Sequence, residues 1–342
     1  MIIALLIYAM VFGYRYCVGV DCMSYVGMYK WVASGYEIEK EYGFIGIMKV
    51  FSSLGLRVEA FMGFCAFIQL FFIFHLFRNY KEIYPYLFLV FMMSGEFLVY
   101  SNIIRSMFAF AIVAYSLKYV QNKKPIIHYL WLLAAFFIHK SSAIMVIVYP
   151  LYILSPVLFS KKYVQYGLLI GSLILMNFDY VQEFISQMDS LMALLGYDEK
   201  YRMDDRMDQE KSIGLGFFIE LSIVCIIIYY STKIKDYYSK LPVNIMYDLF
   251  IIGVILKYSF IGSMLIQRMN VYFVGYTFIL AAMVFDYTKR FRIKYGWYLM
   301  LSLYCLLAFA VLYKMKDNSA MFIFDFQKDL FYLKNDFNYE KY

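Results

Sequence analysis

The chain has 342 residues, of which 63% are hydrophobic and 22% aromatic, and its formal net charge is +7. Together with a mean hydropathy of +0.63, this composition excludes a soluble globular protein and indicates a polytopic membrane protein. The positive charge does not indicate a nucleic-acid partner, because the cations lie in short connections between apolar stretches. No P-loop, GxGxxG or RNA-binding motif occurs in the sequence.

Apolar stretches follow one another at lengths typical of membrane helices rather than of β-barrel strands. The sequence therefore predicts an all-α fold, a polytopic helical bundle of about eleven transmembrane helices. We expect a single integral membrane domain over residues 1–342, since no repeat or low-complexity linker divides the chain. The predicted spans are 1–14, 57–77, 83–101, 103–121, 126–138, 142–159, 164–178, 214–232, 243–262, 268–288 and 296–314.

The basic connections fall on one side of the membrane when the chain alternates between faces at each span. They are Arg78–Lys81, Lys123–Lys124, Lys161–Lys162, Lys233–Lys240 and Lys289–Lys294. The positive-inside rule assigns this side to the cytoplasm. Loops 15–56 and 179–213 are then external, and the tail 315–342 is external or interfacial. The alternation depends on a split between two spans at His139–Ser141.

The two external loops contain features of their own. The apolar stretch Gly43–Leu56 is too short to span a bilayer comfortably, so we expect a re-entrant or interfacial helix. The charged run Asp198–Lys211 is either a solvated loop or a mobile lid over an external site.

Charged side chains also gather at the predicted external face, namely Arg15, Asp21, Arg105, His139 and Arg268. Charges at bilayer depth are costly and commonly mark a substrate path or a reaction site. The three arginines have no predicted buried carboxylate partner, so their convergence would require an anionic ligand such as a phosphate. The alternative for Arg105 is a guanidinium that extends to the lipid headgroups.

Neighbouring residues refine this prediction. Asn102 lies three residues before Arg105, so both would share a helix face. Gly19 permits a turn that brings Asp21 toward Arg15. The two residues then form a structural ion pair. Alternatively, Asp21 acts as a base or binds a sugar hydroxyl. His139 is either a satisfied polar group or a general base.

The remaining polar residues of the spans point to structure rather than chemistry. Glu96, Glu220 and Lys257 lie in apolar stretches, where we expect pairing with neighbours across helices. Three histidines without an HExxH motif argue against a zinc site. The sequence indicates neither a metal ion nor another cofactor.

Several short motifs stand out together. They are Arg15-x-x-x-Gly19-x-Asp21-x-x-x-Tyr25, Glu41-Tyr42-Gly43, Asn102-x-x-Arg105-x-x-x-Ala109, His139-x-Ser141 and, more weakly, Arg268-Met269 with Tyr272. Through these motifs the chain resembles the EpsG family, which is related to the Wzy-type polymerases of bacterial capsule, exopolysaccharide and O-antigen synthesis. The resemblance covers residues 10–160 well, and the rest mainly by hydropathy. Two departures are a shorter first span and Ser106 in place of an expected Gln.

The resemblance implies inverting, metal-independent glycosyl transfer at the outer face of the bacterial cytoplasmic membrane. The substrates would be oligosaccharide repeat units on undecaprenyl diphosphate, and a flippase and a chain-length regulator of the same pathway would be partners beside membrane lipid. Arg15, Arg105 and Arg268 would hold the diphosphate, and His139 or Asp21 would accept the proton of the acceptor hydroxyl. Asn102, Gly19 and Tyr25 would support them.

Other membrane activities share parts of this pattern. A transporter or flippase of lipid-linked sugars would also need cations near a diphosphate, but it should show internal repeats and broken helices. An O-antigen ligase or another membrane transferase would share the arginines and differ in its acceptor. A non-catalytic scaffold of a polysaccharide assembly complex is the fourth alternative.

Overall fold

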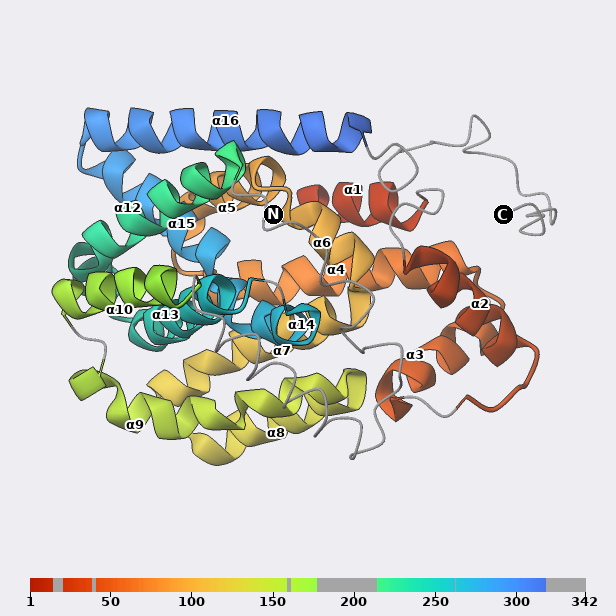
Figure 1. Cartoon of the computed structure of the whole chain (residues 1–342). Coiled ribbons are helices and arrows are strands. Elements are labelled where there is room, and N and C mark those ends of the chain that lie inside the picture. Colours follow the sequence, from red (N-terminus) through yellow and green to blue (C-terminus); the bar gives the residue numbers. More distant parts are fainter. Residues whose placement is uncertain (15–20, 39–40, 159–160, 177–213, 262, 318–342) are drawn as a thin grey trace.

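A computed structural model shows the chain as a bundle of α-helices that run mostly along one common direction (Figure 1). It describes residues 1–14, 21–38, 41–158, 161–176, 214–261 and 263–317. Within these ranges there is no β-strand, so the predicted all-α fold is confirmed.

The described helices are short to medium in length. They are α1 (Ile2–Gly13), α2 (Cys22–Ala33), α3 (Tyr42–Ser53), α4 (Val58–Leu76), α5 (Tyr84–Met93), α6 (Glu96–Asn102), α7 (Ile104–Gln121), α8 (Pro125–Ile138), α9 (Val148–Leu158), α10 (Lys162–Leu175), α12 (Leu215–Tyr237), α13 (Val243–Ser259), α14 (Met264–Val274), α15 (Tyr276–Arg290) and α16 (Lys294–Asp317), with 3-10 helices η1 (Lys81–Ile83) and η2 (Lys140–Ile147).

The number of membrane spans differs from the sequence prediction. Four described helices are long and apolar enough to cross a bilayer, namely Val58–Leu76, Leu215–Tyr237, Ile266–Arg290 and Lys294–Tyr313, and a bent pair raises the number to five. These helices fit a multi-pass membrane protein, but the count of about eleven is not confirmed. The difference arises because several apolar stretches form helices of only 10–17 residues, whereas a bilayer core requires about 20.

The bent pair is the predicted span 83–101, which the structure divides at Ser94–Gly95. Residues Lys81–Met93 and Glu96–Asn102 meet at an angle of 73°. Gly95 adopts a left-handed conformation with φ of +77°, which a residue without a Cβ atom reaches at little cost. The sequence prediction of one continuous helix was therefore wrong here.

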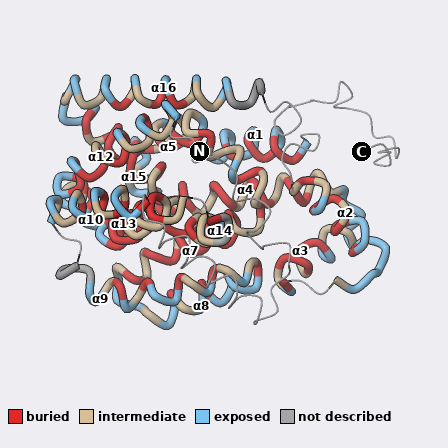
Figure 2. Tube along the Cα trace, in the orientation of Figure 1, coloured by how far each residue is buried: buried red, intermediate tan, exposed pale blue. Residues whose placement is uncertain are grey.

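Helix α7 lies inside the bundle, where α4, α8, η2 and α14 pack around it. Most of its side chains are buried, and Figure 2 shows the central helices in red with paler elements outside. In an 18-residue stretch of Ile266–Arg290, 78% of the residues are buried within the protein, whereas in such a stretch of Lys294–Tyr313 only 17% are. The exposed large apolar side chains of α16 therefore suit contact with lipid.

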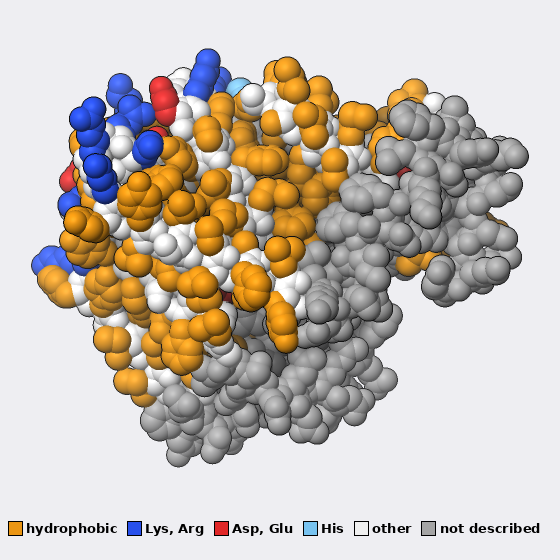
Figure 3. Space-filling view, turned by 90° about the horizontal axis from the view of Figure 1, so that it is seen from above, with side chains coloured by type: hydrophobic (Ala, Val, Ile, Leu, Met, Phe, Trp, Pro, Cys, Tyr) orange, Lys and Arg blue, Asp and Glu red, His pale blue; other side chains and the backbone are white. Residues whose placement is uncertain are grey.

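The basic connections meet at one end of the bundle. The Arg290 guanidinium lies 3.7 Å from the Glu82 carboxylate, and the Gln121 side chain donates a hydrogen bond of 3.3 Å to the Ser239 carbonyl. The Tyr80 and Tyr238 rings, 5.1 Å apart, join these two pairs, so four of the five basic connections come together, as the sequence predicts. Figure 3 shows Lys and Arg side chains gathered at this end and hydrophobic side chains over much of the remaining described surface.

Two helices connect this basic end to the opposite end. Arg105 lies in the first turn of α7 and Gln121 at its last residue, so about 24 Å of helix separates them. Helix α8 begins next to Lys124 at the basic end and stops at Ile138, directly before His139. Arg105 and His139 therefore both lie at the end of the bundle that is away from the basic connections.

Candidate functional site

The Glu41 carboxylate joins two of the residues that the sequence singles out. Arg105 Nη1 donates a hydrogen bond of 2.7 Å to Glu41 Oε2, and His139 Nδ1 lies 2.8 Å from Glu41 Oε1. The Glu41 side chain is 10% exposed, and those of Arg105 and His139 are each 23% exposed. These three residues come from three different parts of the chain and form the centre of the candidate site.

Local structure explains how Glu41 reaches His139. Glu41 directly precedes α3, and the backbone of Gly43 approaches α8 so closely that a Cβ atom there would lie 2.7 Å from the Phe137 carbonyl oxygen. Helix α8 ends one residue later, at Ile138, and His139 is extended with φ of −156° and ψ of 118°. The glycine and the helix end together bring the imidazole next to the carboxylate.

Arg105 keeps hydrogen-bonding capacity beyond its ion pair. Its Nε–H group is buried and has no hydrogen-bond partner among the described residues. The Tyr25 ring lies 5.8 Å from the guanidinium carbon, within the range of a cation–π interaction. An unpaired buried donor on a charged group is costly, so this atom is a candidate contact for an anionic ligand.

Asn102 and Asp21 also meet at this end. The Asp21 backbone N–H donates a hydrogen bond of 3.1 Å to Asn102 Oδ1, which fixes the start of α2 against the end of α6. The helix is interrupted at Ile103, so Asn102 and Arg105 lie on successive helices. The prediction of a shared helix face was wrong, although both residues belong to the same site.

Arg268 lies on α14, one helical turn before Tyr272. The Tyr272 hydroxyl is 3.3 Å from the Ser141 hydroxyl, two residues after His139. Helix α14 is positioned by Asn270, whose Nδ2 donates a hydrogen bond of 3.0 Å to the Gly253 carbonyl. The helix that carries Arg268 is therefore packed against the segment that follows His139.

Arg15 and Gly19 lie outside the described residues, so the expected approach of Asp21 to Arg15 stays a prediction. Of the other sequence-derived candidates, the structure brings Tyr25, Asn102, Arg105 and His139 together, with Asp21 joined through its backbone. Within the described ranges no group of three or more His, Cys, Asp or Glu side chains gathers as metal ligands do.

The expectation that Arg105 has no carboxylate partner was wrong, because Glu41 pairs with it. Sequence reasoning missed Glu41 as a site residue, since its partners are 64 and 98 positions away. The available signal was its place directly before the apolar stretch 42–53, in the motif Glu41-Tyr42-Gly43. Tyr272 was quoted only as a weak motif residue and was not assigned to the site.

Electrostatics fix the protonation state at the centre of the site. Burial raises the pKa of Glu41, but the hydrogen bond with His139 and the charge of Arg105 outweigh burial and lower this pKa from 4.5 to about 2. Glu41 is therefore ionised at neutral pH and can only accept hydrogen bonds. His139 Nδ1 must then carry a proton, which leaves the lone pair of the neutral imidazole on Nε2.

This arrangement can perform acid–base chemistry beside a fixed positive charge. A carboxylate that orients an imidazole through Nδ1 is a recurring way to present Nε2 as a general base. The neighbouring guanidinium can stabilise negative charge that develops on a bound group.

The helical bundle and this polar centre define an integral membrane protein with a candidate catalytic site at one end. The chain belongs to the EpsG family, which matches residues 1–327. Comparison with curated proteins and with solved structures gives no match. Membership is consistent with the Wzy-like polymerase resemblance and supports a glycosyltransferase-like membrane protein of polysaccharide biosynthesis.

We expect Glu41→Gln to reduce the free energy of unfolding at pH 7 by up to about 3 kcal/mol, the equivalent of the pKa shift. Because the folded-state pKa is lowered, the stabilisation is present above the unfolded pKa of 4.5 and is lost as the pH falls toward 2. The apparent unfolding temperatures of wild type and variant in detergent should therefore converge progressively as the pH falls from about 4.5 toward about 2.

Glu82→Gln is the control for this experiment, because the Glu82 side chain is 67% exposed at the basic end. A difference between wild type and Glu41→Gln that stays constant down to about pH 3 would contradict the ionised Glu41.

We expect Gly43→Ala to lower the apparent unfolding temperature, because its new Cβ would collide with the Phe137 backbone. Overpacking of this kind costs about 1–3 kcal/mol. Gly46→Ala on the same helix is the matched control, since a Cβ there meets nothing within 4 Å and alanine favours the helix. Equal unfolding temperatures for the two variants would argue against the close approach of α3 to α8.

Proposed function

We propose that this protein polymerises oligosaccharide repeat units carried on undecaprenyl diphosphate, in bacterial exopolysaccharide, capsule or O-antigen synthesis. The observation that carries the proposal is the Glu41 carboxylate, which orients His139 and lies against Arg105. Family membership supports the class of activity. The site geometry supports separate roles for His139, as a base, and for Arg105, as a cation that stabilises negative charge.

The proposed reaction is an inverting, metal-independent glycosyl transfer. The acceptor hydroxyl attacks the anomeric carbon of the donor sugar, its proton passes to His139 Nε2, and the bond from that carbon to the diphosphate breaks. The electron pair of this bond leaves with the undecaprenyl diphosphate, whose charge Arg105 stabilises. Glu41 keeps the imidazole in the tautomer that accepts the proton and stabilises its cationic form.

Two further arginines complete the proposed diphosphate site. Arg105 alone is partly neutralised by Glu41, so a diphosphate requires more positive charge than this pair supplies. Arg268, on the helix that packs beside Ser141, and Arg15 are proposed to provide it. Asp21 is retained as the alternative base.

The proposed site faces outward from the cytoplasmic membrane. Its residues lie at the end of the bundle away from the basic connections, separated from them by the length of α7. The positive-inside rule places the basic connections in the cytoplasm. Lipid-linked donor and acceptor would then meet the site after a flippase has moved them across, and a chain-length regulator could act on the growing product.

A transporter of lipid-linked sugars is the second candidate function, and the broken helix α5–α6 is the observation that favours it. Discontinuous helices at mid-membrane are typical of substrate sites in transporters. A ligase would use the same polar centre with a different acceptor.

We expect Arg105→Ala to abolish long polymer while the protein remains inserted and abundant, because the leaving diphosphate loses its stabilising charge. A glycan gel, with lipid-linked sugars extracted in parallel, measures this. Arg57→Ala is the matched control, since Arg57 pairs with Glu59 on an exposed turn. Wild-type amounts of polymer from Arg105→Ala would rule out the diphosphate role, and single repeat units retained on the cytoplasmic face would favour transport.

We expect His139→Gln to reduce the rate of polymer formation by about 10²–10⁴-fold, the usual contribution of a general base, with little change in binding of the lipid-linked donor. The assay uses purified protein in nanodiscs and lipid-linked repeat units. His75→Gln, at the last turn of α4, is the control. Full activity of His139→Gln would show that another residue is the base, and Asp21→Asn would then test Asp21.

A further inference from the structure

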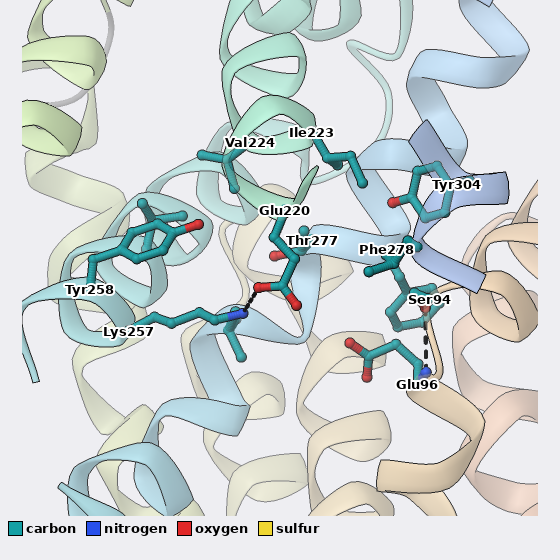
Figure 4. Close-up of a pocket in the computed structure, with 13 residues that line it drawn as sticks. Ser94, Glu96, Glu220, Ile223, Val224, Lys257, Tyr258, Thr277, Phe278 and Tyr304 are labelled. Carbon is teal, nitrogen blue, oxygen red and sulfur yellow. Dashed lines mark hydrogen bonds and ion pairs between the residues drawn. The ribbon is translucent and has the colours of Figure 1, made fainter. Parts of the chain in front are cut away.

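A second polar site lies beside the break between α5 and α6. Figure 4 shows a partly open cavity lined by residues of this break and of α12, α13, α15 and α16. Its volume is about 70 Å³, against the roughly 10–15 Å³ that one water molecule requires. The cavity therefore has room for about five to seven water-sized groups, which is comparable to the six ring atoms of a pyranose without all of its substituents.

Three charged side chains surround this cavity. Lys257 Nζ donates a hydrogen bond of 2.5 Å to Glu220 Oε2, which confirms the pairing across helices that the sequence predicts for these two residues. Figure 4 shows the Glu96 carboxylate turned toward the same space, and it accepts no hydrogen bond from the described residues. Ionisable groups in membrane-spanning helices are costly and are by default candidates for function.

Two hydroxyl groups on the cavity wall lack partners. The Tyr258 side chain is only 1% exposed, and its hydroxyl, which Figure 4 shows pointing into the cavity, has no hydrogen-bond partner among the described residues. The Thr277 hydroxyl is also buried and unpaired in the described part of the chain. Buried polar groups normally have partners, so each of these two hydroxyls keeps unused hydrogen-bonding capacity at the cavity wall.

Aromatic rings complete the lining. Tyr258, Phe278 and Tyr304 contribute ring surface to the wall, next to the carboxylates and the ammonium group. This combination can bind the apolar C–H face of a sugar ring while hydroxyl groups exchange hydrogen bonds with Glu96, Glu220 and Lys257. A purely anionic or cationic ligand fits less well, because the wall carries charges of both signs.

The cavity is close to the candidate catalytic site. Helix α6 begins at Glu96, on the cavity, and ends at Asn102, which binds the Asp21 backbone, so about 9 Å of helix joins the two places. Thr277 follows Tyr272 by little more than one turn within the segment Ile266–Arg290. A substrate whose diphosphate contacts the arginines could thus extend a sugar into the cavity.

We propose that this cavity binds a sugar residue of the lipid-linked oligosaccharide, as a carbohydrate subsite separate from the Glu41–Arg105–His139 centre. The proposal rests on the proposed function for the identity of the ligand. It rests on the unpaired hydroxyls, the charged groups and the ring surfaces for the place where that ligand binds.

The test measures binding of free sugar to the full chain, without catalysis. The probe is a set of oligosaccharides of one to three repeat units, released by partial acid hydrolysis from the host's own polysaccharide and free of lipid and diphosphate. Saturation-transfer NMR on purified protein in nanodiscs gives the dissociation constant. We expect Tyr258→Phe and Thr277→Val each to weaken binding about three- to tenfold, the equivalent of one net hydrogen bond.

These variants are chosen because they should not disturb the fold. Each removes a hydroxyl that has no partner within the described protein, so the unfolding temperature should not fall. Tyr276→Phe is the matched control, since its buried hydroxyl is equally unpaired among the described residues but its side chain packs against Phe110 and does not line the cavity. It should bind sugar as wild type does.

The outcomes separate the two proposals. The subsite is supported if wild type and Arg105→Ala bind the sugar, if Tyr258→Phe and Thr277→Val weaken this binding, and if Tyr276→Phe does not. This holds even if polymer assays fail to show polymerase activity. Absence of binding by wild type, or equal binding by all variants, overturns the subsite. Loss of polymer in Arg105→Ala would leave the proposed function intact in that case.

Discussion

The polar end of this molecule depends on one carboxylate that serves two partners. Glu41 accepts a hydrogen bond from Arg105 on one oxygen and contacts His139 with the other, so it ties the start of α3 to the start of α7 and the end of α8. Each partner is mostly buried, and an ionised group without a counter-charge would be costly there. The three chain segments are therefore joined by charge pairing in addition to the close packing of Gly43 against Phe137.

The same carboxylate limits the chemistry that the site can perform. By neutralising much of the Arg105 charge, it makes diphosphate binding a task for several cations rather than one. By holding the Nδ1 proton of His139, it leaves Nε2 as the atom that can exchange protons with a substrate. The proposed sugar cavity adds a separate set of groups along α6 and α15, so that binding of the sugar and stabilisation of the leaving group are assigned to different residues.

Much of this arrangement follows from the sequence. Composition and hydropathy predict the helical bundle, and the positions of lysine and arginine predict the end at which four basic connections meet. Arg105, His139 and Asn102 are also recognisable, because polar residues beside apolar runs are unusual. The break at Ser94–Gly95 was missed, since hydropathy does not report a left-handed backbone. Glu41 was missed because its role exists only when residues 41, 105 and 139 come together, and spacing along the chain carries no information about that contact.

The broken helix has a consequence for how the protein is made. Helix α5 has 10 residues and α6 has seven, so neither half can enter a bilayer alone. The backbone at their junction must be covered by protein before lipid reaches it. Part of that cover is Val311 of α16, next to Gly95, which is synthesised near the end of the described chain. The α5–α6 junction therefore reaches its final environment only after α16 has been synthesised. Membrane assembly of this region then does not follow the order of translation.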